Sequence, residues 1–409
     1  MQFSFSASRQ ESSILLHGIV RYPSINRLVH PKGSRQSIAE HGDCLMTERI
    51  LGMLYGVVIA GGSGTRFWPE SRKKRPKQLL RIDGHNSLLR ATVDRILGLI
   101  PVERVMVVTV ADQGGQILEE LPELDPAAVI LEPYGRNTAP CIALSAYKLA
   151  AMDPQAIMLV LPADHIIGNI STFLEAVERG ALIAESREVL ITFGIQPTRP
   201  ETGYGYIRTG DHFNSQNYQG VYLVDQFVEK PDRPTAEAYL ESGKYFWNSG
   251  MFMWRASTII RAFERHLPDI HMLMSQVSSS FNTEDEANAI EGIYRDIQSV
   301  SIDNGIMEVA DNVAVIPLDV AWNDVGSWPS LHEVWGSDSN GNSCKGHFVQ
   351  LDSRNCVISA CDKLVALVGV EDLIVVDTPD AILVCHKDAA QQIKKFQEIL
   401  PQCGYGHLL

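Results

Sequence analysis

The segment YGVVIAGGSGTRFWPESRKKRPKQ, residues Tyr55–Gln78, leads from a short apolar run through a glycine-rich turn into a basic cluster. The run Tyr55–Ala60 has the length and composition of a buried strand. Glycines directly after a strand let the backbone approach a ligand closely and point several N–H groups at a phosphate. The segment therefore predicts a strand that ends at a phosphate-binding turn. An ordinary strand-to-helix turn would look similar, and the segment has neither a Walker nor a GxGxxG pattern.

The basic cluster contrasts with the acidity of the whole chain. Lys and Arg number 35 against 49 Asp and Glu, so the formal net charge is −14. Such a chain is not expected to bind nucleic acid or an anionic membrane surface. Local positive charge instead favours a small phosphate-rich ligand. We interpret Arg72–Arg75 as a solvated charged face. Arg66 closes the turn and Pro76 fixes Lys77, so these two cations are the better candidates for binding.

Strand-like and helix-like segments alternate from Leu54 to about residue 195. The further strand-like runs are Val105–Val110, Val129–Leu131, Ala156–Leu161 and Val189–Ile195. Ser87 is the expected N-cap of a helix with apolar residues at period 3.6, and Ala139–Ala151 is also expected to be helical. This alternation predicts an α/β fold with a mostly parallel sheet covered on both faces. The ligand should then bind at the loops beyond the carboxyl ends of the strands.

The two ends of the chain differ from this central α/β domain, which we assign to residues 53–336. Residues 1–52 show no sustained hydrophobic period, and we expect them to form a disordered extension. Residues 337–409 begin with a turn-rich linker and continue with short β-rich pieces about eight to ten residues apart. They predict a small β domain of the β-helix type, closed by a helix over Ala389–Leu400.

The cysteines and the apolar runs bear on location. Seven cysteines are scattered along the chain without a CxxC pair or Cys/His ligand spacing. This favours reduced thiols in a cytoplasmic protein over a disulfide framework or a zinc site. No apolar run approaches the roughly 18 residues of a membrane-spanning helix. We therefore expect a folded cytoplasmic protein with no membrane partner.

The motifs GGSGTRFWP and RPKQLL resemble the signature of the sugar-phosphate nucleotidyltransferases, and most closely that of the mannose-1-phosphate guanylyltransferases. Further blocks match this family in order along residues 53–336. They are EPYGRNTAPCIALSA at Glu132–Ala146, LPADHII at Leu161–Ile167, GYGYI at Gly203–Ile207, FVEKPD at Phe227–Asp232, WNSGMFMW at Trp247–Trp254, SIDNGIME at Ser301–Glu308 and WNDVGSW at Trp322–Trp328. A chance match to all of these blocks is remote, although any single block would be weak.

The resemblance implies a nucleotidyltransferase fold, Rossmann-like with a mostly parallel mixed sheet, followed by a left-handed β-helix. It implies GTP and α-D-mannose 1-phosphate as partners, with GDP-mannose and diphosphate formed by direct in-line attack on the α-phosphorus. It also allows a homodimer. The longer bifunctional relatives carry an isomerase domain that has no counterpart before Leu409, so isomerase activity is not expected.

Two alternatives remain open at this point. One is the same reaction with another nucleoside triphosphate or hexose 1-phosphate. The other is a catalytically silent homologue that binds a sugar nucleotide without converting it. The presence of Lys77, Asp164 and Asp324 together speaks against the silent homologue.

The resemblance also implies roles for individual residues. Mg²⁺ is expected on Asp164 and Asp324, although spacing alone would favour a helix N-cap and a turn residue at these positions. Arg66 and Lys77 are the expected catalytic cations. The nucleotide is expected on Ala60, Gly61, Gly62, Gly64, Thr65, Glu132, Asn137, Thr138 and Asp164. Mannose 1-phosphate is expected on Gly205, Glu229, Lys230 and Asn248. Helix capping is the alternative reading of Asn137 and Thr138. Asn304 and Gly305 replace a bulkier pair of the family, which suggests looser packing near the sugar.

Overall fold

The computed structural model describes residues 47–62, 64–213 and 218–409. The expected extension lies outside the described residues up to residue 46. Its last residues are not an extension, because residues 47–51 are helical and the side chain of Ile50 is only 1% exposed in a core cluster. Arg49 also forms an ion pair with Glu185 at 3.0 Å. The predicted boundary at residue 52 is therefore too late, since a helix this short shows no period in the sequence.

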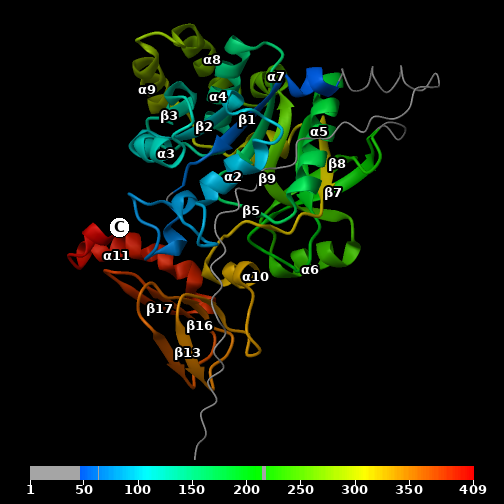
Figure 1. The fold of residues 1–409 in the computed structure, drawn as a ribbon. Coiled ribbons are helices and arrows are strands. Elements are labelled where there is room, and N and C mark those ends of the chain that lie inside the picture. The colour runs from blue at the N-terminus through cyan, green and yellow to red at the C-terminus, as the bar shows by residue number, and fades with distance from the viewer. Residues whose placement is uncertain (1–46, 63, 214–217) are drawn as a thin grey trace, which may run out of the picture. The chain divides into compact units, whose positions relative to one another are not determined.

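A mixed sheet of nine strands forms the centre of the structure, in the order β3-β2-β1-β4-β9-β6-β10-β8-β7 (Figure 1). The strands are β1 (Leu54–Ile59), β2 (Val105–Val110), β3 (Val129–Glu132), β4 (Ile157–Pro162), β6 (Leu190–Ile195), β7 (Gly205–His212), β8 (Tyr222–Glu229), β9 (Tyr245–Arg255) and β10 (Val313–Leu318). Strand β1 pairs in parallel with β2 and β4, whereas β9 runs antiparallel to β4 and β6. The predicted α/β class with a mixed sheet is confirmed. The sheet is not mostly parallel as predicted, because five of its nine strand pairings are antiparallel.

Helices cover both faces of this sheet. They are α2 (Leu88–Ile96), α3 (Gly114–Glu120), α4 (Thr138–Met152), α5 (Ile170–Ser186), α6 (Arg233–Ser242), α7 (Ala256–His266), α8 (Pro268–Val277) and α9 (Glu286–Asp296). Two further helices, α10 (Leu331–Trp335) and α11 (Phe396–Gln402), contribute Leu331 and Leu400 to a separate cluster with the C-terminal part. Ser87 caps α2 as predicted, because its hydroxyl accepts a hydrogen bond from the backbone N–H of Arg90 at 3.0 Å. In the part of the chain that the structure describes, no helix is both long and apolar enough to span a membrane.

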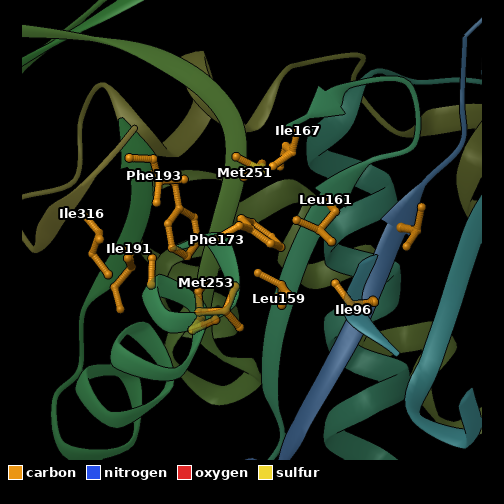
Figure 2. Packing of buried hydrophobic residues seen from close by; sticks show 14 of the residues in the cluster. Ile96, Leu159, Leu161, Ile167, Phe173, Ile191, Phe193, Met251, Met253 and Ile316 are labelled. Atoms are coloured by element: carbon orange, nitrogen blue, oxygen red, sulfur yellow. The ribbon is translucent and has the colours of Figure 1, made fainter. Parts of the chain in front are cut away.

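Alternate residues of the central strands pack into two separate hydrophobic cores. Leu159 and Leu161 of β4 pack with Ile96 of α2 and Phe173 of α5, as Figure 2 shows. Met158, from the same strand, belongs to the cluster built on α4, α7 and α8. Strand positions of opposite parity therefore face opposite sides, which is why these runs are apolar throughout rather than alternating.

The C-terminal part confirms the predicted β-helix type. Its strands are β12 (Ser343–Lys345), β13 (Phe348–Leu351), β14 (Val357–Ser359), β15 (Val365–Val368), β16 (Leu373–Asp377) and β17 (Ile382–His386). Strands β12, β14 and β16 stack in parallel, as do β13 and β15, and antiparallel β17 ends the stack.

The predicted closing helix is wrong in form. A 3₁₀ segment, η9 (Lys387–Lys395), precedes α11 (Phe396–Gln402). The buried residues of η9 are Ala390 and Ile393, three positions apart. In a helix with three residues per turn, side chains three positions apart lie directly above one another, so this pair shares the buried face.

The C-terminal part packs against the glycine-rich segment. Phe67 and Trp68 share a buried cluster with Val376 and Ile393. The indole N–H of Trp68 donates to the carbonyl oxygen of Leu408 at 2.9 Å. Residues 46–409 accordingly form one compact unit.

Arg72 takes part in this contact and corrects one interpretation. Its guanidinium pairs with Asp380 at 2.7 Å and donates to Leu408, and its side chain is 15% exposed. The solvated-face interpretation is therefore wrong for Arg72, although Lys73, Lys74 and Arg75 are exposed. A partner more than 300 residues away in the chain leaves no local pattern around Arg72.

Candidate active site

The glycine-rich turn closes tightly onto Lys77. Gly64 has a φ of +56°, and a Cβ atom built on it would lie 2.3 Å from Cβ of Lys77. Only glycine tolerates this conformation and this approach. The hydroxyl of Ser71 donates to the carbonyl oxygen of Gly64 at 2.7 Å and fixes the turn from the other side.

The carbonyl of Ala60 anchors the start of the turn. It accepts hydrogen bonds from the side chains of Gln78 and Thr109, each at 2.9 Å. Ala60 is buried and does not line a cavity described below, although the resemblance implied nucleotide contact there. Its neighbour Gly61 is exposed but also lies outside those cavities. In this structure Ala60 is an anchor for the turn.

A cavity of about 370 Å³ opens in front of the turn. Seven of the residues implied by the resemblance line it: Gly62, Gly64, Thr65, Arg66, Lys77, Asp164 and Asp324. Phe67, Gln78, His165, Gly326 and Lys394 complete the lining. The structure thus brings together the turn, both expected catalytic cations and both expected metal ligands.

Lys77 connects the two acidic loops. Its ammonium donates to the Asp164 carboxylate at 2.7 Å and to the backbone carbonyl of Asp324 at 2.8 Å. The loops meet because the short strands β5 (Ile166–Ile167) and β11 (Trp322–Asn323) pair antiparallel directly beside them. The sequence carried no sign of this pairing, since both strands have only two residues.

Tyr204 orients Asp324, a role that sequence reasoning missed. The Tyr204 hydroxyl donates to Oδ1 of Asp324 at 2.7 Å, and the backbone N–H of Gly326 donates to the same oxygen at 3.1 Å. The Tyr204 ring lies between Trp247 and Trp322 in edge-on contacts. Oδ2 of Asp324 accepts no hydrogen bond from any described residue, and it remains available to a ligand.

The charge states around Asp164 favour an ionised carboxylate. Burial would raise the pKa of Asp164, but the charge of Lys77 and its hydrogen bond to the carboxylate outweigh burial and lower the pKa. Burial lowers the pKa of His165. The Trp322 indole N–H donates to Nδ1 of His165 at 3.3 Å, which suits a neutral ring. The cavity therefore presents a carboxylate and a neutral imidazole at neutral pH.

Asp164 and Asp324 fit a hard divalent cation. Mg²⁺ takes one or two protein carboxylates and fills its remaining positions with phosphate oxygens and water. The free Oδ2 of Asp324 and the ionised Asp164 offer these carboxylates to one cavity. Across residues 47–62, 64–213 and 218–409, no group of three or more His, Cys, Asp or Glu side chains could hold a metal by itself. Phosphate oxygens and water would supply the remaining ligands.

A second cavity, of about 710 Å³, adjoins the first and shares Arg66, Asp324 and Gly326 with it. Lys230 lines it together with Tyr204 and Arg199. Lys230 has a φ of +49°, and its ammonium pairs with Glu229 at 2.8 Å while most of the side chain remains exposed. Arg66 has no partner among the described residues and lines both cavities. A ligand in either cavity can therefore reach Arg66.

The other expected sugar-binding residues, Gly205, Glu229 and Asn248, lie together beside Lys230 but are not among the residues that line this cavity. A Cβ atom on Gly205 would lie 2.5 Å from Oε2 of Glu229 and 3.2 Å from Cβ of Asn248. The Asn248 amide donates to Oδ1 of Asp303 at 2.8 Å. Burial, together with the charge of Glu229, raises the pKa of Asp303 to about 6. Asp303 belongs to the block SIDNGIME and had no role assigned from sequence.

Asp303 begins a π-helical turn, η7 (Asp303–Met307). Gly305 in this turn packs against Leu267, and a Cβ atom on Gly305 would lie 2.7 Å from Cδ1 of Leu267. The expectation of looser packing at this glycine is therefore wrong. The missing side chain lets the turn approach Leu267, between α7 and α8, closely.

The block at Glu132–Thr138 does not line either cavity. Glu132 is 4% exposed and accepts a hydrogen bond from the Tyr294 hydroxyl at 2.9 Å. Burial raises the pKa of the Glu132 carboxyl to about 7, although the Tyr294 bond acts in the opposite direction. Asn137 accepts from the backbone N–H of Thr138, and Thr138 accepts from that of Ile302. The capping interpretation thus describes Asn137, whereas Thr138 bonds to a distant segment and Glu132 to Tyr294; nucleotide contact at this block stays a prediction.

Comparison with known proteins agrees with the fold. The family model described as "Nucleotidyl transferase" matches residues 55–340, and the "MannoseP isomerase/GMP-like beta-helix domain" model matches residues 346–400. The mannose-1-phosphate guanylyltransferase of Klebsiella pneumoniae is 42% identical over 86% of this chain and 74% of its own length. An alginate biosynthesis protein of Pseudomonas aeruginosa is 40% identical over 83% of this chain and 70% of its own.

A solved structure shows the same similarity in three dimensions. The crystal structure described as mannose-1-phosphate geranyltransferase from Thermus thermophilus superposes with a TM-score of 0.76 at 35% identity. The match covers 85% of this chain and 99% of that one.

Proposed function

The chain belongs to the nucleotidyl transferase family, among the mannose-1-phosphate guanylyltransferases, and we propose on this basis how its two cavities divide the reaction. GTP binds in the cavity in front of the glycine-rich turn, and α-D-mannose 1-phosphate binds in the adjoining cavity at Lys230. The products are GDP-mannose and diphosphate. The observation that carries this proposal is that Arg66 and Asp324 line both cavities. The two phosphates would meet at these residues.

The protein does not need to supply a nucleophile. A sugar phosphate is already ionised at neutral pH, and its oxygen attacks the α-phosphorus of GTP in line with the departing diphosphate. The protein must therefore position two anions and offset their repulsion. The backbone of Gly62, Gly64 and Thr65 faces the nucleotide phosphates, and Arg66 binds where the attacking and attacked phosphates meet.

Three charged residues, Lys77, Asp164 and Asp324, line the nucleotide cavity together. Bound Mg²⁺, held by Asp164 and Asp324, would offset phosphate charge and orient the leaving group. Lys77 keeps Asp164 ionised and holds the Asp324 loop in place through its carbonyl. Tyr204 fixes Oδ1 of Asp324, so that Oδ2 is presented to the cavity.

On the sugar side, Lys230 would bind the phosphate and the cluster beside it would bind the hydroxyls. Glu229 accepts hydrogen bonds, whereas Asn248 both donates and accepts, which suits neighbouring sugar hydroxyls. Gly205 lets the backbone lie close to both side chains. Asp303 would orient the Asn248 amide.

The location and the assembly are part of the proposal. All six cysteines in the described part of the chain are free, which supports a cytoplasmic protein. A homodimer remains the assembly we propose on the basis of the family alone.

The test is diphosphate release measured for pairs of four nucleoside triphosphates and several hexose 1-phosphates. We expect the highest kcat/KM for GTP with mannose 1-phosphate. A higher value for another pair would assign a different specificity. No release with any pair, while calorimetry detects sugar-nucleotide binding, would support the silent homologue instead.

A further inference from the structure

The 3₁₀ segment η9 forms one wall of both cavities, although it follows the β-helix-type part of the chain. Lys394 lines the nucleotide cavity. Lys387, Asp388, Ala390 and Gln391 line the cavity assigned to the sugar phosphate. Neither the family resemblance nor the sequence pattern assigned a role to any of these residues.

The position of η9 is fixed by its buried side. Ala390 and Ile393 are buried in the same cluster as Phe67 of the glycine-rich segment and Trp328 of the Asp324 loop. At its start, the Lys387 ammonium donates to Oδ1 of Asn355 at 2.6 Å. Lys394 is therefore carried on an anchored segment, directly next to the buried Ile393.

Lys394 differs from the other cations of the nucleotide cavity in its partners. The Lys77 ammonium is already bonded to Asp164 and to the Asp324 carbonyl. Lys394 is exposed, and its ammonium forms no hydrogen bond or ion pair with any described residue. An unpaired ammonium beside a phosphate-binding turn has its donors available for an anion.

The cavity linings indicate which part of the nucleotide Lys394 can reach. Arg66 lines both cavities, so it marks the place where the sugar phosphate meets the α-phosphate. Lys394 lines the nucleotide cavity and is not among the residues that line the second cavity. We propose that Lys394 binds the β- and γ-phosphates of the bound nucleoside triphosphate, and thus the departing diphosphate. The C-terminal part of the chain then completes the active site. This inference rests on the proposed function.

The role requires no proton transfer. The bond between the α-phosphorus and its oxygen bridge to the β-phosphorus breaks, and the diphosphate leaves with the electron pair. Lys394 remains protonated and donates hydrogen bonds to the diphosphate oxygens as their negative charge increases. Such charge-assisted bonds are stronger than bonds between neutral groups.

The test compares Lys394→Ala with Lys395→Ala in the full-length chain. The two variants lose the same charge from neighbouring exposed positions, but Lys395 is not among the residues that line the cavity. For Lys394→Ala we expect kcat/KM for GTP to fall about tenfold, the usual scale for one charge-assisted contact. The KM for diphosphate in the reverse reaction should rise by a similar factor. The KM for mannose 1-phosphate should not change, and Lys394→Arg should restore most of the loss.

Binding measurements separate this inference from the proposed function. GDP-mannose lacks the distal phosphates of GTP, so Lys394→Ala should weaken GTP binding in calorimetry and leave GDP-mannose binding unchanged. If Lys394→Ala and Lys395→Ala have the same kinetics, or if GDP-mannose binding weakens equally, the inference is wrong. A wild-type protein that does not convert GTP would instead overturn the proposed function, whatever Lys394 does.

Discussion

Replacing Asp324 with Asn tests the metal site with little change in structure. The amide keeps Oδ1, which accepts from the Tyr204 hydroxyl and from the Gly326 N–H. Lys77 bonds to the backbone carbonyl of Asp324 and loses nothing. Only Oδ2, which has no partner among the residues described, becomes an NH₂ group. The substitution therefore removes one charged ligand and preserves the hydrogen bonds of the loop.

The expected effect is large for the reaction and small for stability. A charged group aimed at developing charge typically contributes about 3 kcal/mol, so kcat should fall roughly a hundredfold or more. The melting temperature without ligand should be unchanged or slightly higher, because one of two nearby carboxylates is neutralised. Initial rates of diphosphate release are measured against Mg²⁺ concentration for the wild type and for Asp324→Asn. The variant should need more Mg²⁺ for half its maximal rate.

Asp319→Asn is the matched control for this experiment. Asp319 is an exposed carboxylate five positions earlier on the same segment and does not line the nucleotide cavity. This control should keep the wild-type rate and Mg²⁺ dependence. If Asp324→Asn behaves like the control, Asp324 is an ordinary turn residue and the reasoning about the metal is refuted.

Three further predictions concern the rest of the chain. Burial raises the pKa of Glu132 to about 7 from its ordinary value of 4.5. As pH rises from 5 to 8 the unfolded state releases this proton first, so the wild type loses stability, and in urea denaturation the free energy of unfolding of Glu132→Gln should rise by about 2 to 3 kcal/mol relative to the wild type. A relative stability that does not change with pH would contradict the buried carboxyl. A chain starting at Met53 lacks the buried Ile50, so its free energy of unfolding should be about 2 to 4 kcal/mol lower than that of a chain starting at Met46. Equal free energies of unfolding would show that the burial of Ile50 does not stabilise the fold. Lys230→Ala should raise the KM for mannose 1-phosphate about tenfold, and a rise for GTP instead would move Lys230 to the nucleotide.

The regular elements could be predicted because their signals are local. The strand Val105–Val110 and the cap at Ser87 each follow from a few adjacent residues, and both are found as predicted. The glycine-rich turn could also be predicted, because glycines directly after a strand let the backbone approach a ligand closely. These features required no knowledge of which distant segments meet.

The parts that could not be predicted depend on contacts between distant segments. Spacing alone favoured a helix N-cap at Asp164 and a turn residue at Asp324. Only the family resemblance predicted that both belong to one metal site. Their loops meet through a pair of two-residue strands, too short to show a pattern. Glu132 occupies a motif whose residue types suit base recognition, yet its carboxyl is buried against Tyr294. Lys394 lies within the predicted helix Ala389–Leu400, and only the folded chain shows that it lines the cavity.

The contact between Trp68 and Leu408 also constrains when the enzyme can become active during its synthesis. These residues are 340 positions apart in the chain. The ribosome makes the glycine-rich segment early, but Ile393 and Leu408, which cover it, emerge more than 300 residues later. A nascent chain therefore carries an uncovered Phe67 and Trp68 through most of its translation. Any product that stops before η9 lacks both this cover and Lys394, so the active site is finished only after the β-helix-type part has been made.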